Sequence, residues 1–171
     1  PSLLVDCCEA VGTVCDNSVS CSGYSGCPES GVYGIYGQRG ECGRPRAVGY
    51  NPFRQLGVIS GLSYLHLHNN RLSGTIPSQL GNISGLLVLN LSNNSLTGTI
   101  PEQLSDISGL RDLILIHNSI SGTIPAQLGG ISGLRRLELD NNRLSGTIPA
   151  QLGGISGLRR LELDNNRLSG T

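Results

Sequence analysis

The chain has 171 residues, enough for one domain or one short repeat array. Twelve basic residues, all Arg, balance twelve acidic ones, so the net charge is zero and we expect no nucleic-acid or anionic-membrane partner. The sequence contains no Lys, which excludes a Schiff-base lysine, and no apolar run long enough to span a bilayer.

The cysteines are confined to the start of the chain, in a polar, Gly-rich segment. Six of them cluster there: Cys7, Cys8, Cys15, Cys21, Cys27 and Cys42. An even number of clustered cysteines indicates disulfides and therefore an oxidising, extracellular compartment. A zinc site is the alternative, but the cysteine spacings exceed the usual knuckle and no His lies nearby. We expect disulfides, with the pairing left open and no metal. The chain has no Met, as expected if a signal peptide has been removed.

The rest of the chain repeats one unit, which we call a rung. The segment ISGL begins at residues 59, 83, 107, 131 and 155, and it opens the pattern L-x-x-L-x-L-x-x-N-x-L-[ST]-G-T-I-P each time. Residues 121–147 are identical to residues 145–171. The L-x-L alternation predicts a short strand with its leucines on one face, and Gly and Pro then turn the chain. One rung cannot bury its own leucines, so the rungs must stack.

One Asn in each rung occupies a fixed position just after the predicted strand. Its amide can bond the backbone groups left open at the bend, one rung after another. We therefore expect a structural role, not a ligand site, for the Asn ladder: Asn70, Asn94, Asn118, Asn142 and Asn166.

The repeat resembles the leucine-rich repeat family in its plant-type, 24-residue form, as found in extracellular and receptor-like ectodomains. The resemblance implies a right-handed solenoid of the α/β class, mostly β and irregular. Its L-x-L strands would form a parallel sheet on the concave face, and the G-x-I-P segments would form a second strip on one flank. Short 3₁₀ turns, such as the one at residues 79–81, would line the convex side.

The N-terminal part is expected to be a cap. Residues 1–55 would form a disulfide-rich cap with a degenerate first rung, and residues 56–171 would form five rungs, the last one truncated. In the degenerate rung, Val32, Ile35 and Gly37 have the spacing of the first three leucines of a rung.

The concave face is the expected binding surface, because the family usually binds its ligands there. The outward positions run from aromatic and His, through apolar, to charged side chains. Ile114 and Ile116 are the unusual pair, since exposed large apolar side chains indicate either a contact surface or a simple covering of the sheet. The predicted binding residues are Tyr64, His66, His68, Val88, Asn90, Asp112, Ile114, Ile116, His117, Arg136, Glu138, Asp140, Arg160, Glu162 and Asp164.

No catalytic motif is present, and neither metal arrangement is favoured. His66 and His68 face the same way, but His117 lies two rungs further on, so a three-His site would need strain. Stacked rows pair Glu138 with Glu162 and Asp140 with Asp164. Diagonal Arg side chains can offset their repulsion, whereas calcium would need six or more oxygens. We expect no enzyme activity, metal or cofactor.

Two further features of the sequence indicate possible surface functions, namely the glycosylation sequons and the repeated hydroxyl residues. Sequons at Asn82, Asn90 and Asn93 are candidate glycosylation sites, and a glycan on Asn90 would block the concave face. The [ST]-G-T segments predict two parallel hydroxyl rows on the flank, resembling those of ice-binding proteins, although the repeat explains the same residues by packing. The rows are Ser73, Thr97, Ser121, Ser145 and Ser169, and Thr75, Thr99, Thr123, Thr147 and Thr171.

The last rung is expected to expose Leu158, Leu161, Leu163 and Leu168 along an unpaired edge. Either further repeats follow, or copies of the chain stack head to tail there.

Taken together, these features predict a secreted or cell-surface, non-catalytic module that binds a protein, a peptide or a cell-wall glycan. The alternative is an ice-binding or fibre-forming structural solenoid.

Overall fold

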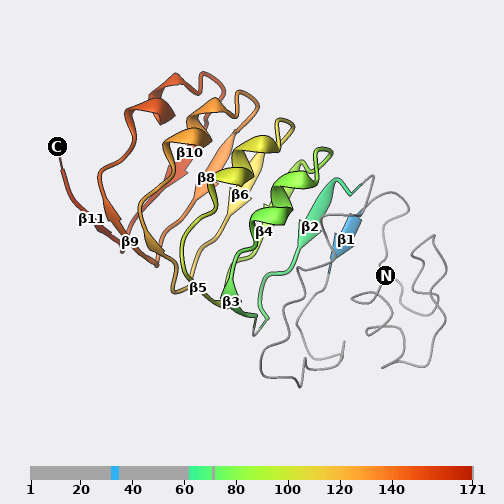
Figure 1. Cartoon of the computed structure of the whole chain (residues 1–171), viewed down its shortest axis with the longest axis horizontal. Helices are drawn as coiled ribbons and strands as arrows, with labels where there is room; N and C mark the ends of the chain where they lie inside the picture. Colours follow the sequence, from blue (N-terminus) through green and yellow to red (C-terminus); the bar gives the residue numbers. More distant parts are fainter. Residues whose placement is uncertain (1–31, 35–61, 71, 171) are drawn as a thin grey trace.

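The computed structural model describes residues 32–34, 62–70 and 72–170. The predicted cysteine cluster, and with it most of the expected cap, lies outside the described residues. The described part is a curved stack of rungs (Figure 1). The four rungs that begin with β2, β4, β6 and β8 each have one inner strand, one short flank strand and one outer 3₁₀ turn, whereas the fifth is described only through its strands β10 and β11.

The inner face is a six-stranded parallel sheet, as expected. Its strands follow the chain in the order β1, β2, β4, β6, β8, β10. From β2 onward the register advances by one repeat per strand, so Leu65 lies opposite Leu89, and Leu89 lies opposite Leu113. The strand bounds are β1 Val32–Gly34, β2 Tyr64–His66, β4 Val88–Asn90, β6 Asp112–Ile114, β8 Arg136–Glu138 and β10 Arg160–Glu162.

The degenerate rung does pair with the first full rung, but the predicted register is wrong. Tyr33, not Ile35, lies opposite Leu65, which shifts the pairing by two residues. Glycines at positions 31, 34 and 37 flank the few apolar residues of this segment. Register is weakly specified in Gly-rich strands, because few side chains commit them to one face.

The flank and the outer side are also built from the repeat. Flank strands are β3 Ser73–Thr75, β5 Ser95–Thr97, β7 Ser121–Gly122, β9 Arg143–Gly146 and β11 Arg167–Leu168. The outer 3₁₀ turns are η2 Ser78–Asn82, η3 Glu102–Asp106, η4 Ala126–Gly130 and η5 Ala150–Gly154. Each turn begins directly after the Pro of the G-x-I-P segment, whose extended backbone leads the chain out of the flank.

The flank strands are not stacked at the 24-residue step of the inner sheet. Ser73 lies opposite Ser95, and Thr75 lies opposite Thr97, so the flank register advances by 22 residues. The pairs Ser121 with Arg143 and Arg167 with Ser145 follow the same step. The backbone pairing of the flank therefore joins positions of the repeat that differ by two residues.

The core consists of the repeated Leu and Ile side chains, from Leu62 to Ile155. Most of them are fully buried, and each such side chain contributes about 1.5–3 kcal/mol when it leaves water. In the last rung Leu161 is exposed, whereas Leu158, Leu163 and Leu168 are partly buried against this core. The prediction of four exposed leucines is thus wrong for three of them, because the preceding rung covers them.

The Asn side chains close the bend after each inner strand. Asn118 donates to the carbonyls of Leu91, Leu115 and Ile116 at 3.0–3.3 Å, and its Oδ1 accepts from the Leu96 amide at 3.0 Å. The equivalent four bonds are made in their own rungs by Asn94, Asn142 and Asn166. The residue before each Asn has a positive φ of 53–56°, a conformation that Asn tolerates better than most residues.

Candidate functional site

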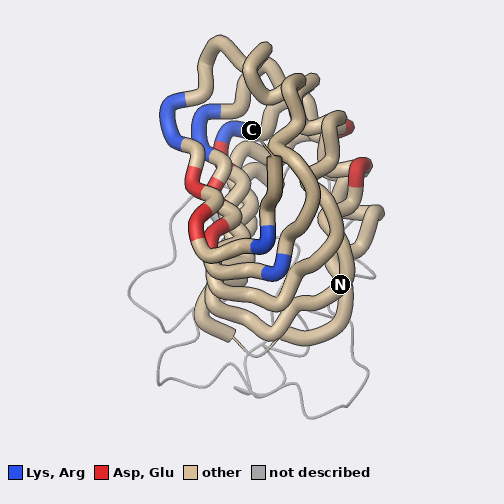
Figure 2. The backbone as a smooth tube through the Cα atoms, turned by 90° about the vertical axis from the view of Figure 1, so that its left-hand side faces the viewer, with Lys and Arg blue, Asp and Glu red and all other residues tan. Residues whose placement is uncertain are grey.

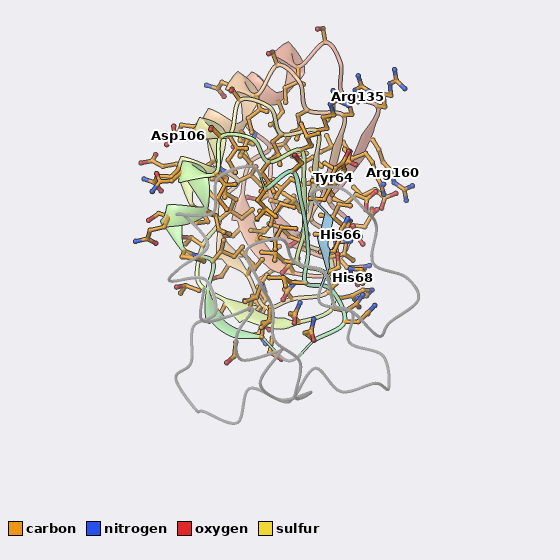
Figure 3. All side chains as sticks on the ribbon, turned by 90° about the vertical axis from the view of Figure 1, so that its right-hand side faces the viewer. Tyr64, His66, His68, Asp106, Arg135 and Arg160 are labelled. Carbon is orange, nitrogen blue, oxygen red and sulfur yellow. The ribbon has the colours of Figure 1, made fainter. Side chains whose placement is uncertain are left out.

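The outward side chains of the inner sheet surround a shallow hollow of about 710 Å³. It extends from Tyr64, His66 and His68 on the first rung to Glu138 and Asp140 on the fourth. Figure 3 shows Tyr64, His66 and His68 following one another along strand β2 and just past its end, on the side away from Asp106 of the outer turns. Of the predicted binding residues, Arg160, Glu162 and Asp164 do not line this hollow.

The first rung presents a histidine pair. The rings of His66 and His68 are 6.0 Å apart and nearly perpendicular, so both side chains face the same side, as expected. Burial lowers the pKa of His66 below its usual 6.5, and the neighbouring His68 lowers the pKa further. His66 is therefore mostly neutral at neutral pH and can accept or donate a hydrogen bond there.

The middle of the face differs from the prediction. Ile114 is only 7% exposed, so the expectation of an exposed isoleucine is wrong, and Ile116 is half-buried. In the sheet, Asn90 and Glu138 flank Ile114 on the neighbouring strands. Ile114 therefore lies between two polar side chains of the same face, and little of its surface reaches water.

Glu138 is the second outward residue that proves buried. Its Oε1 accepts from Arg136 at 2.7 Å and from Arg160 of the next rung at 2.8 Å, and its side chain is 3% exposed. The hydrogen bond that Arg136 donates to Glu138 raises the pKa of the Arg136 guanidinium, against the opposing effect of burial. Arg160 also contacts Glu162 at 2.6 Å. The Arg rows thus offset the stacked carboxylates diagonally, as expected from the sequence.

Asp140, beside this network, has one carboxylate oxygen that receives no hydrogen bond from the described residues. Its Oδ2 accepts from Asn141 at 3.1 Å. Its Oδ1 is shielded from solvent, and within residues 62–70 and 72–170 no donor reaches it. An acceptor in this position is costly unless a donor arrives.

The flank hydroxyl rows have unequal roles. Thr97, Ser121 and Ser145 of the inner row donate to backbone carbonyls of the preceding rung at 3.2–3.4 Å. Thr75, Thr99, Thr123 and Thr147, which form the second hydroxyl row, are exposed. The first three of them border a groove of about 1000 Å³ together with the turns η2, η3 and η4. Their methyl groups lie over the next rung's glycine: a Cβ added to Gly98 would lie 2.7 Å from Thr75 Cγ2.

The sequons lie in different settings. Asn82 is exposed at the end of turn η2, and Asn93 is exposed just after strand β4. Asn90 lines the hollow, and its Oδ1 accepts from the Ser92 amide and hydroxyl at 3.1 and 2.7 Å.

Two absences concern only the part of the chain that the structure describes. There, no group of three or more His, Cys, Asp or Glu side chains could hold a metal ion. No helix in the same ranges is long and apolar enough to cross a membrane.

One set of surface residues was not predicted, because only the positions around L-x-L were considered in the sequence. Arg111, Arg135 and Arg159 lie directly before strands β6, β8 and β10 and are exposed. Figure 2 shows one group of basic positions at one edge of the stack, with acidic positions beside it, and other basic positions apart from this group. The signal was available in the sequence, because the three arginines are separated by 24 residues.

The sequence pattern that defines the leucine rich repeat family matches residues 60–120 and 108–168. The chain belongs to the leucine-rich repeat family. The match spans the rungs that form the hollow, so the candidate site lies on the concave sheet of a leucine-rich repeat protein of the plant type. No curated protein sequence matches this leucine-rich repeat chain.

Solved structures similar to this leucine-rich repeat chain are plant proteins. The ectodomain of the Arabidopsis receptor kinase HAESA, bound to an extended IDA peptide hormone, is 36% identical, with a TM-score of 0.65, over 67% of this chain and 19% of that one. The BIR3–SERK2 complex from Arabidopsis thaliana is 30% identical, with a TM-score of 0.63, over 99% and 83%. A plant ice-binding protein is 34% identical, with a TM-score of 0.58, over 63% and 34%. The chain spans only 18% to 20% of the length of the long receptors that it matches.

Proposed function

We propose that this leucine-rich repeat protein acts outside the cell as a non-catalytic recognition module, and that its concave face binds a peptide or an extended protein segment. The observation that carries the proposal is the hollow itself. It crosses neighbouring strands of the sheet and changes from His and aromatic through apolar to charged side chains. Such a graded surface can fix the direction and register of an extended ligand.

Two further observations support a peptide. Asp140 lines the hollow, and a rotation of its carboxylate would present Oδ1, which has no donor among the described residues, to a backbone N–H of the ligand. The similar receptor kinase HAESA has an ectodomain that binds a peptide hormone. The ectodomain character of that relative also supports the extracellular location.

The test begins with selection of peptides from a random display library on the full chain. Tyr64→Ala and Asp140→Asn are expected to weaken binding of the selected peptides by at least about tenfold, because both side chains line the hollow. Gln151→Ala, an exposed change in the outer turn η5, is the matched control and should leave binding unchanged. Equal binding by all variants, or selection of plant glycans in place of peptides, would contradict the proposal.

A second candidate function, ice binding, is favoured by the outer Thr row on the flank. Thr75, Thr99, Thr123 and Thr147 are exposed at successive rungs, about 4.8 Å apart along the stack. Their methyl groups are held over glycines of the next rung, which fixes the side chains in one orientation. The similarity to a plant ice-binding protein supports this candidate independently.

The two candidates separate in one assay of ice recrystallisation. If the flank binds ice, Thr99→Val and Thr123→Val should abolish inhibition of recrystallisation, whereas Tyr64→Ala should not alter it. If the wild-type chain leaves recrystallisation unaffected, the ice-binding candidate is wrong.

A further inference from the structure

The arginine edge, defined as Arg111, Arg135 and Arg159, forms a continuous row at the start of the inner strands. The Arg135 amide donates to the Arg111 carbonyl at 2.7 Å, and the Arg159 amide donates to the Arg135 carbonyl at 2.8 Å. The three residues are therefore direct neighbours across the sheet. Figure 3 shows Arg135 and Arg160 projecting from the same side of the molecule.

The arginine edge lacks the carboxylate partners that its neighbours have. Arg136 and Arg160 contact Glu138 and Glu162 at 2.6–2.8 Å. Among the described residues, no carboxylate forms an ion pair with Arg111, Arg135 or Arg159. Like charges at directly opposed positions of a sheet repel one another, so an anion bound along this row would relieve an unfavourable arrangement.

A groove of about 570 Å³ connects the arginine edge to an apolar surface. Tyr64, Leu87 and Val88 line it on the first two rungs, and all three are half-buried. The arginine edge lines it on the next three rungs. Arg136, Arg160 and one carboxylate, Asp112, complete the lining. The groove therefore changes along the solenoid from apolar to predominantly cationic.

We propose that the arginine edge holds the acidic part of an extended peptide, whose apolar part lies on Tyr64, Leu87 and Val88. This inference rests on the proposed function and names the chemistry of its ligand. Each exposed guanidinium can donate two parallel hydrogen bonds to a carboxylate. An amide or a hydroxyl group of a ligand carries no negative charge, so it would be bound more weakly.

The charges around the groove favour a peptide over other polyanions. Strands β8 and β10 end in Glu138 and Glu162, and Asp140 and Asp164 follow them. These acidic residues would repel a broad polyanion such as a nucleic acid, so only a narrow chain on the arginine side fits. An acidic polysaccharide carries its charge along its whole length, and would place carboxylates on the apolar end of the groove.

The experiment measures fluorescence anisotropy of a labelled peptide with a Leu-rich half and a Glu-rich half, mixed with the full chain. The matched probe has Gln in place of every Glu. We expect the Gln probe to bind at least about tenfold more weakly, and added salt to weaken binding of the Glu probe.

The variants test the location. Arg135→Gln with Arg159→Gln should weaken binding of the Glu probe by at least about tenfold, because two charged hydrogen-bond donors are lost. Arg143→Gln with Arg167→Gln changes two exposed arginines of the flank strands and is the matched control, since net charge changes equally. Equal binding of the Glu and Gln probes, no binding of either, or equal loss in both double variants would overturn the inference.

Two other results separate the alternatives. Arginine-dependent binding of polygalacturonate that displaces the Glu probe would overturn the inference in favour of an acidic polysaccharide. Library-selected peptides that depend on Tyr64 and Asp140 but bind the arginine-edge variant normally would overturn the inference and leave the proposed function standing.

Discussion

Residues 121–147 and 145–171 have the same sequence, yet their equivalent side chains are in different environments. Leu137 is fully buried, whereas Leu161 is 41% exposed. The Glu138 side chain is 3% exposed and contacts two arginines, whereas Glu162 is 32% exposed and contacts one. The difference is that the fourth rung packs between two others, whereas among the described residues the fifth packs against one.

This comparison shows that burial belongs to the interface between rungs and not to the rung. In a solenoid, stability is approximately the sum of the intrinsic stabilities of the repeats and the interactions between nearest neighbours. The two identical segments therefore form an internal control, in which one substitution can be made in either environment.

The largest difference is expected for the core leucine. Leu137→Ala should lower the free energy of unfolding by about 2–5 kcal/mol, because a fully enclosed side chain leaves a cavity. Leu161→Ala should cost less than about 1 kcal/mol, because its site is open to water. Urea unfolding of both full-length variants measures the difference, and equal losses would show that neighbouring rungs do not determine these energies.

The Asn ladder should give the next largest difference. Asn142 and Asn166 make equivalent bonds, but Asn142 is buried and Asn166 is half-buried. Asn142→Ala should cost about 1–3 kcal/mol, and Asn166→Ala less, since water can reach the orphaned groups. Hydrogen exchange checks the mechanism, because Ile120 should lose protection in the first variant and Leu144 in the second. Unchanged protection of both amides would argue against a structural ladder.

The carboxylates should differ by less. Glu138→Gln should cost about 1 kcal/mol, because it weakens two ion pairs whose arginines remain solvated, and Glu162→Gln only a few tenths. Thermal unfolding at low and high salt measures both variants. The difference should shrink at high salt, because salt screens these partly exposed pairs. A difference that is independent of salt would indicate packing instead of charge.

The smallest effect is expected for protonation of His66, and the question is whether the resulting loss of stability is confined to the neighbouring rungs. Burial and His68 lower the pKa of His66 in the folded chain, so the folded state binds fewer protons than the unfolded state. Stability should be highest above pH 6.5 and should fall as the pH decreases through 6.5 toward the folded-state pKa. Hydrogen exchange should show this loss at strands β2 and β4 but not at β8, and His66→Asn should remove it. A uniform loss along the stack would contradict local coupling.

The fold could be predicted from the sequence because each repeated residue has the same structural role in every rung. The L-x-L leucines, the Asn amides and the G-x-I-P turns each occupy the position expected from the pattern. The structure differs from the sequence-based prediction where the 24-residue spacing of the repeat does not determine how the backbones pair. The flank register advances by 22 residues because its backbone bonds run at an offset from the inner sheet, and no side-chain spacing reports that offset.

The candidate site was less predictable, since outward positions are shaped by their neighbours. Ile114 and Glu138 have outward positions in the pattern, but both are buried, and Glu138 contacts Arg160 of the next rung. The arginine edge was readable from its spacing. Its lack of carboxylate partners was not, because only the coordinates show that Arg136 and Arg160, one residue further on, occupy the nearby carboxylates.

The contact of each Thr methyl with the glycine of the next rung has a consequence for how such chains change length. The contacts from Thr75 to Gly98 and from Thr123 to Gly146 join the same two offsets of the repeat. The Asn bonds likewise join fixed offsets. A rung copied by unequal recombination therefore arrives with its partners already matched on both sides, and needs no compensating substitutions. The identity of residues 121–147 and 145–171 is what a gene would show shortly after such an event.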